Sequence, residues 1–237
     1  MLLTYLPFPA TDGHLRESHR VFDYAKKYKV QFLGWEDLRN VVDFDIDFYD
    51  SDHHMNYSGG RKISKYIGKY LTEQYKLTDQ RKNIQYKHWY DDFCEYKKIR
   101  LEVIKKDYKS LKNTLMQLSD RNFSYAVYFP SDRLYQNKIV MKLLRNIGAD
   151  VEQIYFQSPN LIIVDNKKKK VTYRTMNETA NSSFGKLSVK KSKDGSVFEV
   201  NGQTILEIKN SERLEAAVIV FDNDSGKRVA AQKYQAL

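Results

Sequence analysis

The stretch Phe123-Ser124-Tyr125-Ala126-Val127-Tyr128-Phe129, which Pro130 ends, sets the fold of the second half of the chain. Its aromatic and β-branched residues are typical of a buried strand, and proline cannot continue a strand ladder. Residues 134–147 then show the apolar spacing of an amphipathic helix, with Gly148 as its expected C-cap. Further strands are expected at residues 161–164, 171–174, 186–190, 197–200, 205–208 and 216–221. Residues 121–237 are therefore predicted to form an α+β domain dominated by strands.

A long amphipathic helix is expected immediately before this domain, over residues 89–118. Apolar residues recur there at alternating spacings of three and four, which makes a heptad-like seam. The seam consists of Leu101, Ile104, Tyr108, Leu111, Leu115 and Leu118. We expect it to pack on a domain of this chain or on a helix of a protein partner. Residues 76–120 are therefore predicted to be a polar linker and this helix, with a domain boundary near residue 120.

Residues 1–75 show the alternation of an α/β domain. An apolar run at residues 2–8 is followed by a helical stripe over 15–29 and a second strand over 30–35. A further helix after Gly60 has its apolar residues on one face. The predicted fold class is an α/β unit, joined by the long helix to a strand-rich α+β second domain.

The net charge of the 237-residue chain is +10, but its basic residues are scattered. The longest basic run, Lys167–Lys170, falls between two expected strands, where lysine is common on a solvated hairpin tip. No helix-turn-helix, zinc-finger or glycine-rich loop pattern accompanies the charge. We therefore expect a lysine-rich surface and no nucleic-acid partner.

Several classes of protein are excluded by composition. The single cysteine, Cys94, excludes an internal disulfide and a multi-cysteine zinc site. No run of about 18 apolar residues is present, so no membrane-spanning helix is expected. The first residues lack the positive and apolar regions of a signal peptide, and they begin at once as a strand, which suggests a chain cut from something longer.

One segment combines carboxylates with histidines: Asp50-Ser51-Asp52-His53-His54-Met55-Asn56-Tyr57-Ser58-Gly59-Gly60. An aspartate beside a histidine can fix the imidazole tautomer and stabilise its cation during base catalysis. Asp50 and His53 have an Asp-x-x-His spacing that a short loop can close. The alternative is a solvated acidic loop with two surface histidines. A metal ion needs three or more convergent ligands, and adjacent histidines in an extended stretch point apart, so neither a metal nor a cofactor is expected.

Residues 54–60, together with 62–67 and Tyr70-Leu71, resemble the last conserved block of SGNH (GDSL-like) hydrolases. In that family an Asp-x-x-His loop is followed by Leu/Met-Asn, a glycine and the C-terminal helix. The strand–helix–strand of residues 2–35 is similar to the unit that leads into this block. The resemblance covers about residues 1–73. It implies that a histidine is the general base and that an aspartate orients it.

The resemblance leaves two candidates for the base. His54 matches by the Met-Asn-Tyr-Ser-Gly that follows it, whereas His53 matches by its spacing from Asp50. We favour His54, with Asp50 or Asp52 as its partner. No Gly-Asp-Ser-like turn precedes residue 50, so the family's serine nucleophile and oxyanion donors are missing, and the chain alone is expected to be inactive. The chain is then a C-terminal fragment of a longer enzyme or an inactive remnant.

The C-terminal part is more weakly similar to the interleukin-like EMT-inducer domain. The similarity rests on the FSYAVYF strand, the helix that ends at Gly148 and Ala149, and the LIIVD-NKKKKV segment. It also rests on residues 197–202 and 216–227, and covers about residues 122–235. Because this domain occurs attached to carbohydrate-active proteins, the resemblance implies a module that recognises a glycan or a protein.

Taken together, these features predict the C-terminal portion of an SGNH-type esterase or O-acyltransferase. The resemblance implies acylated surface polysaccharide as the substrate class and a bacterial cell-surface or extracellular location. The alternative is a non-catalytic glycan- or protein-binding protein with a vestigial SGNH segment.

Overall fold

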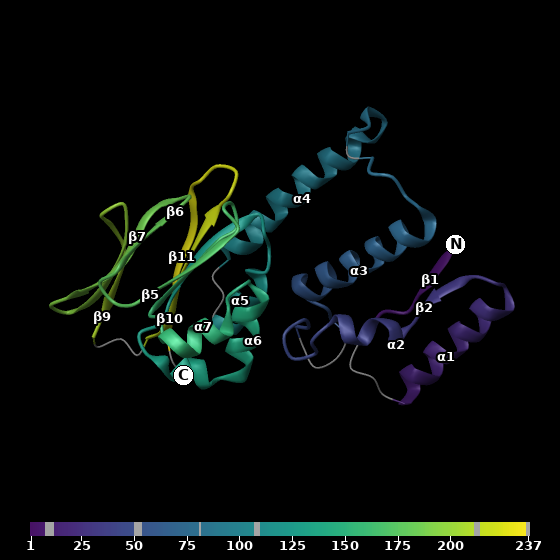
Figure 1. The fold of residues 1–237 in the computed structure, drawn as a ribbon, viewed down its shortest axis with the longest axis horizontal. Helices are drawn as coiled ribbons and strands as arrows, with labels where there is room; N and C mark the ends of the chain where they lie inside the picture. Colours follow the sequence, from purple (N-terminus) through teal and green to yellow (C-terminus); the bar gives the residue numbers. More distant parts are fainter. Residues whose placement is uncertain (8–11, 50–53, 81, 107–109, 211–213, 236–237) are drawn as a thin grey trace. The chain divides into compact units, whose positions relative to one another are not determined.

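The computed structural model describes two compact units, residues 1–82 and 83–237 (Figure 1). The described residues are 1–7, 12–49, 54–80, 82–106, 110–210 and 214–235. The chain is a mixed α/β protein with several antiparallel sheets. None of the helices in the described ranges is both long enough and apolar enough to cross a membrane.

The first unit begins with a parallel strand pair. Strand β1 (Leu2–Thr4) pairs with β2 (Gln31–Leu33), and helix α1 (Asp12–Lys27) connects them. Parallel neighbours require such a crossover, because a hairpin can join only antiparallel strands. The predicted strand–helix–strand order is therefore confirmed, although β1 is shorter than the apolar run at 2–8.

The core of the first unit lies between this strand pair and the helices that follow it. Helix α2 (Trp35–Leu38) and the 3-10 turn η1 (Arg39–Val41) lead toward helix α3 (Tyr57–Tyr75). Apolar residues from these elements form one buried cluster: Leu33, Leu38, Val42, Phe48 and Ile63. The sequence prediction was wrong at Trp35, which opens α2 instead of ending the second strand.

Helix α1 exposes the aromatic residues of the apolar stripe at residues 15–29. Ala25 is buried, whereas the rings of Phe22, Tyr24 and Tyr28 are half-exposed or more. Tyr24 and Tyr28 stack on each other with ring centroids 6.4 Å apart. Their four-residue spacing brings them together on the helix surface, so part of the helical period reflects this contact.

The single helix expected over residues 89–118 is wrong, because the chain forms two helices there. Helix α4 (Lys87–Lys105) follows the 3-10 turn η2 (Ile84–Tyr86), and α5 (Leu111–Gln117) starts anew. Lys106 is extended, and the Ser110 side chain caps α5 by accepting from Asn113 N. The N-cap at Ser110 starts a separate helix, even though the apolar spacing in the sequence continues from α4 to α5.

Most of the described seam residues nevertheless face protein; Leu101 is half-buried, and Tyr108 lies outside the described residues. Ile104, Leu111, Leu115 and Leu118 are buried, α4 contacts strand β11 (Arg228–Gln235), and α5 contacts helix α6 (Lys138–Asn146). These contacts place both helices in the second unit. The division therefore falls after Lys82, whereas the sequence placed a boundary near residue 120.

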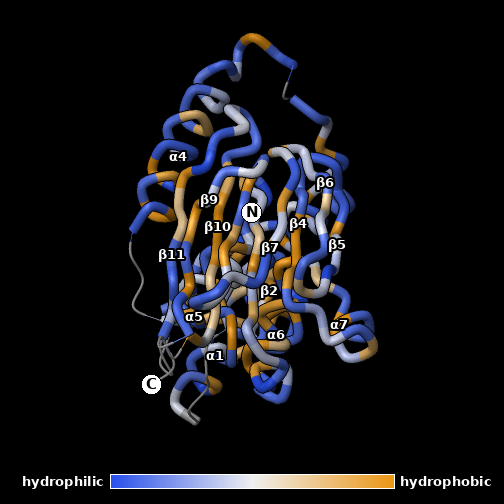
Figure 2. Tube along the Cα trace, turned by 90° about the vertical axis from the view of Figure 1, so that its left-hand side faces the viewer, coloured by the Kyte–Doolittle hydropathy of each residue, from blue (hydrophilic) through white to orange (hydrophobic). Residues whose placement is uncertain are grey.

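A five-stranded antiparallel sheet forms the centre of the second unit, with the strand order β11-β10-β3-β4-β5. Its other strands are β3 (Phe123–Tyr128), β4 (Leu161–Asp165), β5 (Lys170–Arg174) and β10 (Leu214–Asp222). Figure 2 shows hydrophobic residues along β4 and β10. Every residue of β3 is buried, because both faces of the sheet are covered. Helices α5, α6 and α7 (Val151–Gln157) group beside the sheet (Figure 1), and the 3-10 turn η3 (Asp132–Gln136) contacts α6.

A second, four-stranded sheet packs on the five-stranded one. It is an antiparallel meander of four strands: β6 (Thr179–Ser182), β7 (Gly185–Ser192), β8 (Gly195–Val200) and β9 (Gln203–Lys209). The shared core joins residues such as Leu187 and Phe198 to Ile163 and Ile219 of the central sheet. The predicted Asn201-Gly202 hairpin turn is confirmed, and both residues have positive φ. The sequence prediction missed β6, β11 and α7.

Candidate functional site

One of the four predicted catalytic residues lies in the described part of the chain. Asp50, Asp52 and His53 lie outside the described residues, so their pairing with a base stays a prediction. His54 is exposed, and its backbone carbonyl accepts from Tyr49 N at 2.8 Å. An antiparallel bridge between Phe48 and Met55 closes the loop around it. The histidine is therefore held at the base of a closed loop that leads into α3.

Asn56 fixes the start of helix α3. Its side-chain oxygen accepts from Ser58 N at 2.9 Å and from Gly59 N at 3.2 Å, as an N-cap does. Its side-chain amide donates to the Ile46 carbonyl at 2.7 Å, and the residue is buried. The asparagine thus binds the helix to the preceding segment. His54 lies only two residues before this cap, so its backbone position is tied to both elements.

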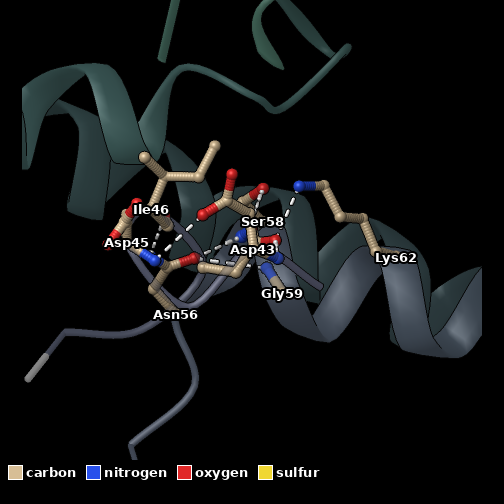
Figure 3. Close-up of polar contacts among 8 residues, drawn as sticks. Asp43, Asp45, Ile46, Asn56, Ser58, Gly59 and Lys62 are labelled. Atoms are coloured by element: carbon tan, nitrogen blue, oxygen red, sulfur yellow. Dashed lines mark hydrogen bonds and ion pairs between the residues drawn. The ribbon is translucent and has the colours of Figure 1, made fainter. Parts of the chain in front are cut away.

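A buried carboxylate, Asp47, binds the start of the same helix, where Figure 3 labels Ser58 and Lys62. Its Oδ1 accepts from Ser58 Oγ at 2.6 Å. Its Oδ2 accepts from Lys62 Nζ at 2.6 Å and from Asp43 N at 2.7 Å. We call Asp43, Asp47, Ser58 and Lys62 the Asp47 cluster. Opposite charge and three donors compensate for the burial of this carboxylate.

Gly59 permits the close approach of α3 to this segment. A Cβ at this position would lie 2.6 Å from the Asp47 carbonyl oxygen and 2.5 Å from Met55 Cγ. Both distances are shorter than normal contacts, so only glycine fits without movement. Asn56, Ser58 and Gly59 of the motif that suggested catalysis therefore each have a role in holding the loop and the helix together.

A pocket of about 720 Å³ opens beside the Asp47 cluster, and we call it the Trp35 pocket. Its lining includes Trp35, Arg39, Phe44 and Lys62. The Arg39 guanidinium carbon lies 4.9 Å from the centre of the Trp35 ring, which is cation–π geometry. Asp43 also lines the pocket, so two members of the Asp47 cluster border it, whereas His54 does not.

The sequence singled out the acidic segment, but it did not indicate that Asp47 is the buried carboxylate within it. Asp47 was not among the predicted site residues, although the spacing of Ser58 and Lys62 puts both on one face of a helix. A serine and a lysine at this i, i+4 spacing, after a run of aspartates, were the available signal. Within the described ranges, no group of three or more histidine, cysteine or acidic residues is arranged to hold a metal ion.

Comparison with known proteins adds no assignment, because no family model, no curated protein and no solved structure matches the chain.

Proposed function

We propose that residues 1–75 are the C-terminal portion of an SGNH-type esterase or O-acyltransferase that acts on acylated polysaccharide. The observation that carries the proposal is the order of the elements in the first unit. A parallel strand pair with a helical crossover leads into a closed loop, and an exposed histidine in that loop precedes a capped helix. This is the order in which the SGNH family presents its base.

In this proposal His54 is the general base. Its imidazole takes the proton of a serine hydroxyl as the serine oxygen attacks the ester carbonyl, and returns it to the departing sugar oxygen. Asp50 or Asp52 would orient the ring. Asn56 and Asp47 act as positioning residues, because they hold the loop and α3 in place.

The proposal requires a serine and an oxyanion hole from a segment other than residues 1–49, which hold no Gly-Asp-Ser-like turn. Residues 1–237 alone should therefore not hydrolyse p-nitrophenyl acetate or an acetylated glycan. Turnover by the purified chain, if it survived replacement of both His53 and His54, would contradict the assigned site.

The direct test uses a protein in which the 237 residues follow an SGNH block that carries the nucleophile. There, H54A should lower kcat/KM on acetylated glycan by about 10²–10⁴-fold, the contribution of a general base. H19A, which removes an exposed histidine of α1 in the same unit, is the matched control and should leave the rate unchanged. If H54A kept full activity while H53A lost it, the base would be His53. Full activity in both variants would reject the proposal.

A second candidate function is glycan binding without catalysis, which the Trp35 pocket favours. An aromatic face beside arginine, lysine and carboxylate side chains can stack on a sugar ring and bind its hydroxyl groups. The two functions make opposite predictions for two variants. Under pure binding, W35A should abolish retention on a polysaccharide in affinity electrophoresis, whereas H54A should change neither retention nor any turnover.

A further inference from the structure

A pocket in the second unit is independent of the site proposed above. Its volume is about 380 Å³, toward the lower end of the range for small-molecule sites. Six of its lining residues are polar or charged: Ser119, Arg121, Asn146, Asn166, Lys169 and Lys170. We propose that this pocket, the Arg121 pocket, binds a small ligand through an anionic group, either a phosphate or a carboxylate.

The charge of the lining is the first argument. Three cationic side chains border the pocket, and no aspartate or glutamate is among its described lining residues. The acidic residues next to it in sequence are already engaged. Asp120 accepts from Arg100 Nε at 3.1 Å, and Asp165 accepts from Ser183 N at 2.7 Å. No carboxylate among the described lining residues therefore offsets the positive charge of the pocket.

Ser119 supplies an independent observation. The residue lines the pocket and is buried, and its Oγ has no hydrogen-bond partner among the described residues. A buried hydroxyl without a partner is destabilising, so such groups are rare in folded proteins. A ligand oxygen in the pocket would provide the missing acceptor after a small rotation of the hydroxyl.

The turn that carries the lysines is held in place before any ligand binds. Asn166 Nδ2 donates to the Phe123 carbonyl at 2.7 Å, and Lys168 N donates to Asp165 Oδ1 at 3.0 Å. Lys169 has a φ of 53°, which turns the chain from β4 into β5. A preformed turn lowers the entropy cost of fixing its side chains on a ligand. The basic run, expected only as a solvated hairpin tip, thus contributes two of its four lysines to a pocket.

The rest of the lining indicates what the anion is attached to. Tyr125, Ile147 and Val171 add apolar surface to the same pocket. A free inorganic ion would leave that surface unused, whereas a sugar phosphate or a sugar acid could place a ring face against it. The probes are therefore glucose 6-phosphate, glucuronate and inorganic phosphate, with uncharged glucose as the comparison.

Calorimetric titration of the full chain in a low-salt, phosphate-free buffer tests the proposal. We expect glucose 6-phosphate or glucuronate to bind more tightly than inorganic phosphate, and glucose not to bind. Which of the two sugar ligands binds distinguishes phosphate from carboxylate. Binding should weaken as salt is added, because ions screen the attraction. If neither sugar anion bound, or if glucose bound equally well, the proposal would be wrong.

Two double variants with the same charge change locate the site. K169Q/K170Q should weaken binding by at least about tenfold, because it removes charge-assisted hydrogen bonds. K167Q/K168Q alters the same run outside the pocket lining and should change the affinity by less than about twofold. Equal weakening by both would mean diffuse attraction and no site. S119A should weaken binding without lowering the melting temperature, since its Oγ has no partner to lose among the described residues. An unchanged affinity for S119A would contradict the role of Ser119 in the site.

Discussion

Arg100 on α4 and Asp120, twenty residues further along the chain, form a buried ion pair with 3.1 Å between Nε and Oδ2. Their side chains are only 6% and 0% exposed. The guanidinium also donates to the side-chain and backbone oxygens of Gln117, at 3.1 and 3.2 Å. One arginine therefore joins α4 to the end of α5 and to Asp120, three residues before β3 begins.

Removal of this arginine should strongly destabilise the second unit. R100A leaves Asp120 buried without its cation, a change that typically costs about 3–5 kcal/mol. Lys97, one turn earlier, pairs with Asp224 at the surface, so K97A is the control and should cost about 0–1 kcal/mol. Urea unfolding of both variants measures the difference. Similar small losses in the two variants would mean that the buried pair contributes no more than the exposed one.

Two glycines of α3 should respond to alanine in opposite directions. G59A forces a Cβ against the Asp47 carbonyl and Met55, and overpacking of this kind costs about 1–3 kcal/mol. G68A has open space around its Cβ, and alanine favours a helix by about 1 kcal/mol over glycine. Thermal unfolding should show a lower melting temperature for the first variant and a higher one for the second. A stabilised G59A would mean that α3 does not approach Asp47 as closely as described.

The seam residue Leu111 should be important for the stability of the second unit. It is fully buried in α5, and truncation of a buried leucine to alanine costs about 2–5 kcal/mol. Its neighbour Lys112 is exposed, so K112A should leave the free energy of unfolding within about 0.5 kcal/mol of the parent. A change within error for L111A would indicate that α5 is a solvated connector.

Alkaline pH should destabilise the protein through its buried tyrosines. Burial raises the pKa of Tyr135 above its ordinary value, and the charge of Asp132 raises it further. Burial also raises the pKa of Tyr128 and of Tyr173. A raised folded-state pKa contributes stability that is fully present below the unfolded pKa of about 10 and is lost as pH rises through the folded pKa. Melting temperatures should therefore fall steeply above about pH 10.

Substitution can measure how much Tyr135 contributes to this loss of folding stability at alkaline pH. Its hydroxyl donates to the Pro159 carbonyl, so Y135F should be less stable near neutral pH by about 1 kcal/mol. The same variant should lose less stability than the parent above pH 10, because one ionisation is removed. Y155F, at an exposed position of α7, should follow the parent at every pH. Parallel curves for Y135F and the parent would contradict the prediction.

Local signals in the sequence were sufficient for most elements of the fold. The spacing of apolar residues predicted α3 and α6, and the Asn201-Gly202 pair predicted the turn from β8 to β9 because both residues adopt positive φ readily. The strands that were missed lack such signals. β6 reads Thr-Ala-Asn-Ser, and β11 reads Arg-Val-Ala-Ala-Gln-Lys-Tyr-Gln along an edge of its sheet. Each has few of the β-branched and aromatic residues that mark a strand.

The candidate site was only partly predictable, because its decisive contacts join residues that are distant in sequence. The segment around His54 was recognised from its composition. Ser58 and Lys62, however, meet Asp47 across 11 and 15 residues, and no local pattern specifies which of several aspartates is buried. The break between α4 and α5 had a local signal in Ser110, but the continuous apolar spacing concealed it.

The order of strands in the central sheet has a consequence for how the second unit is made in the cell. β3 lies between β4 and β10, so the carbonyl and amide groups on one side of residues 123–128 are paired only once residues 217–222 have been synthesised. The meander β6-β7-β8-β9 needs only neighbouring segments and can form during translation. Contacts between residues so far apart in sequence slow folding. Until they form, the unpaired edge of β3 can pair with strands of other chains. A chain whose synthesis stops before β10 would therefore be prone to aggregation, whereas a chain that includes β10 can pair this edge of β3.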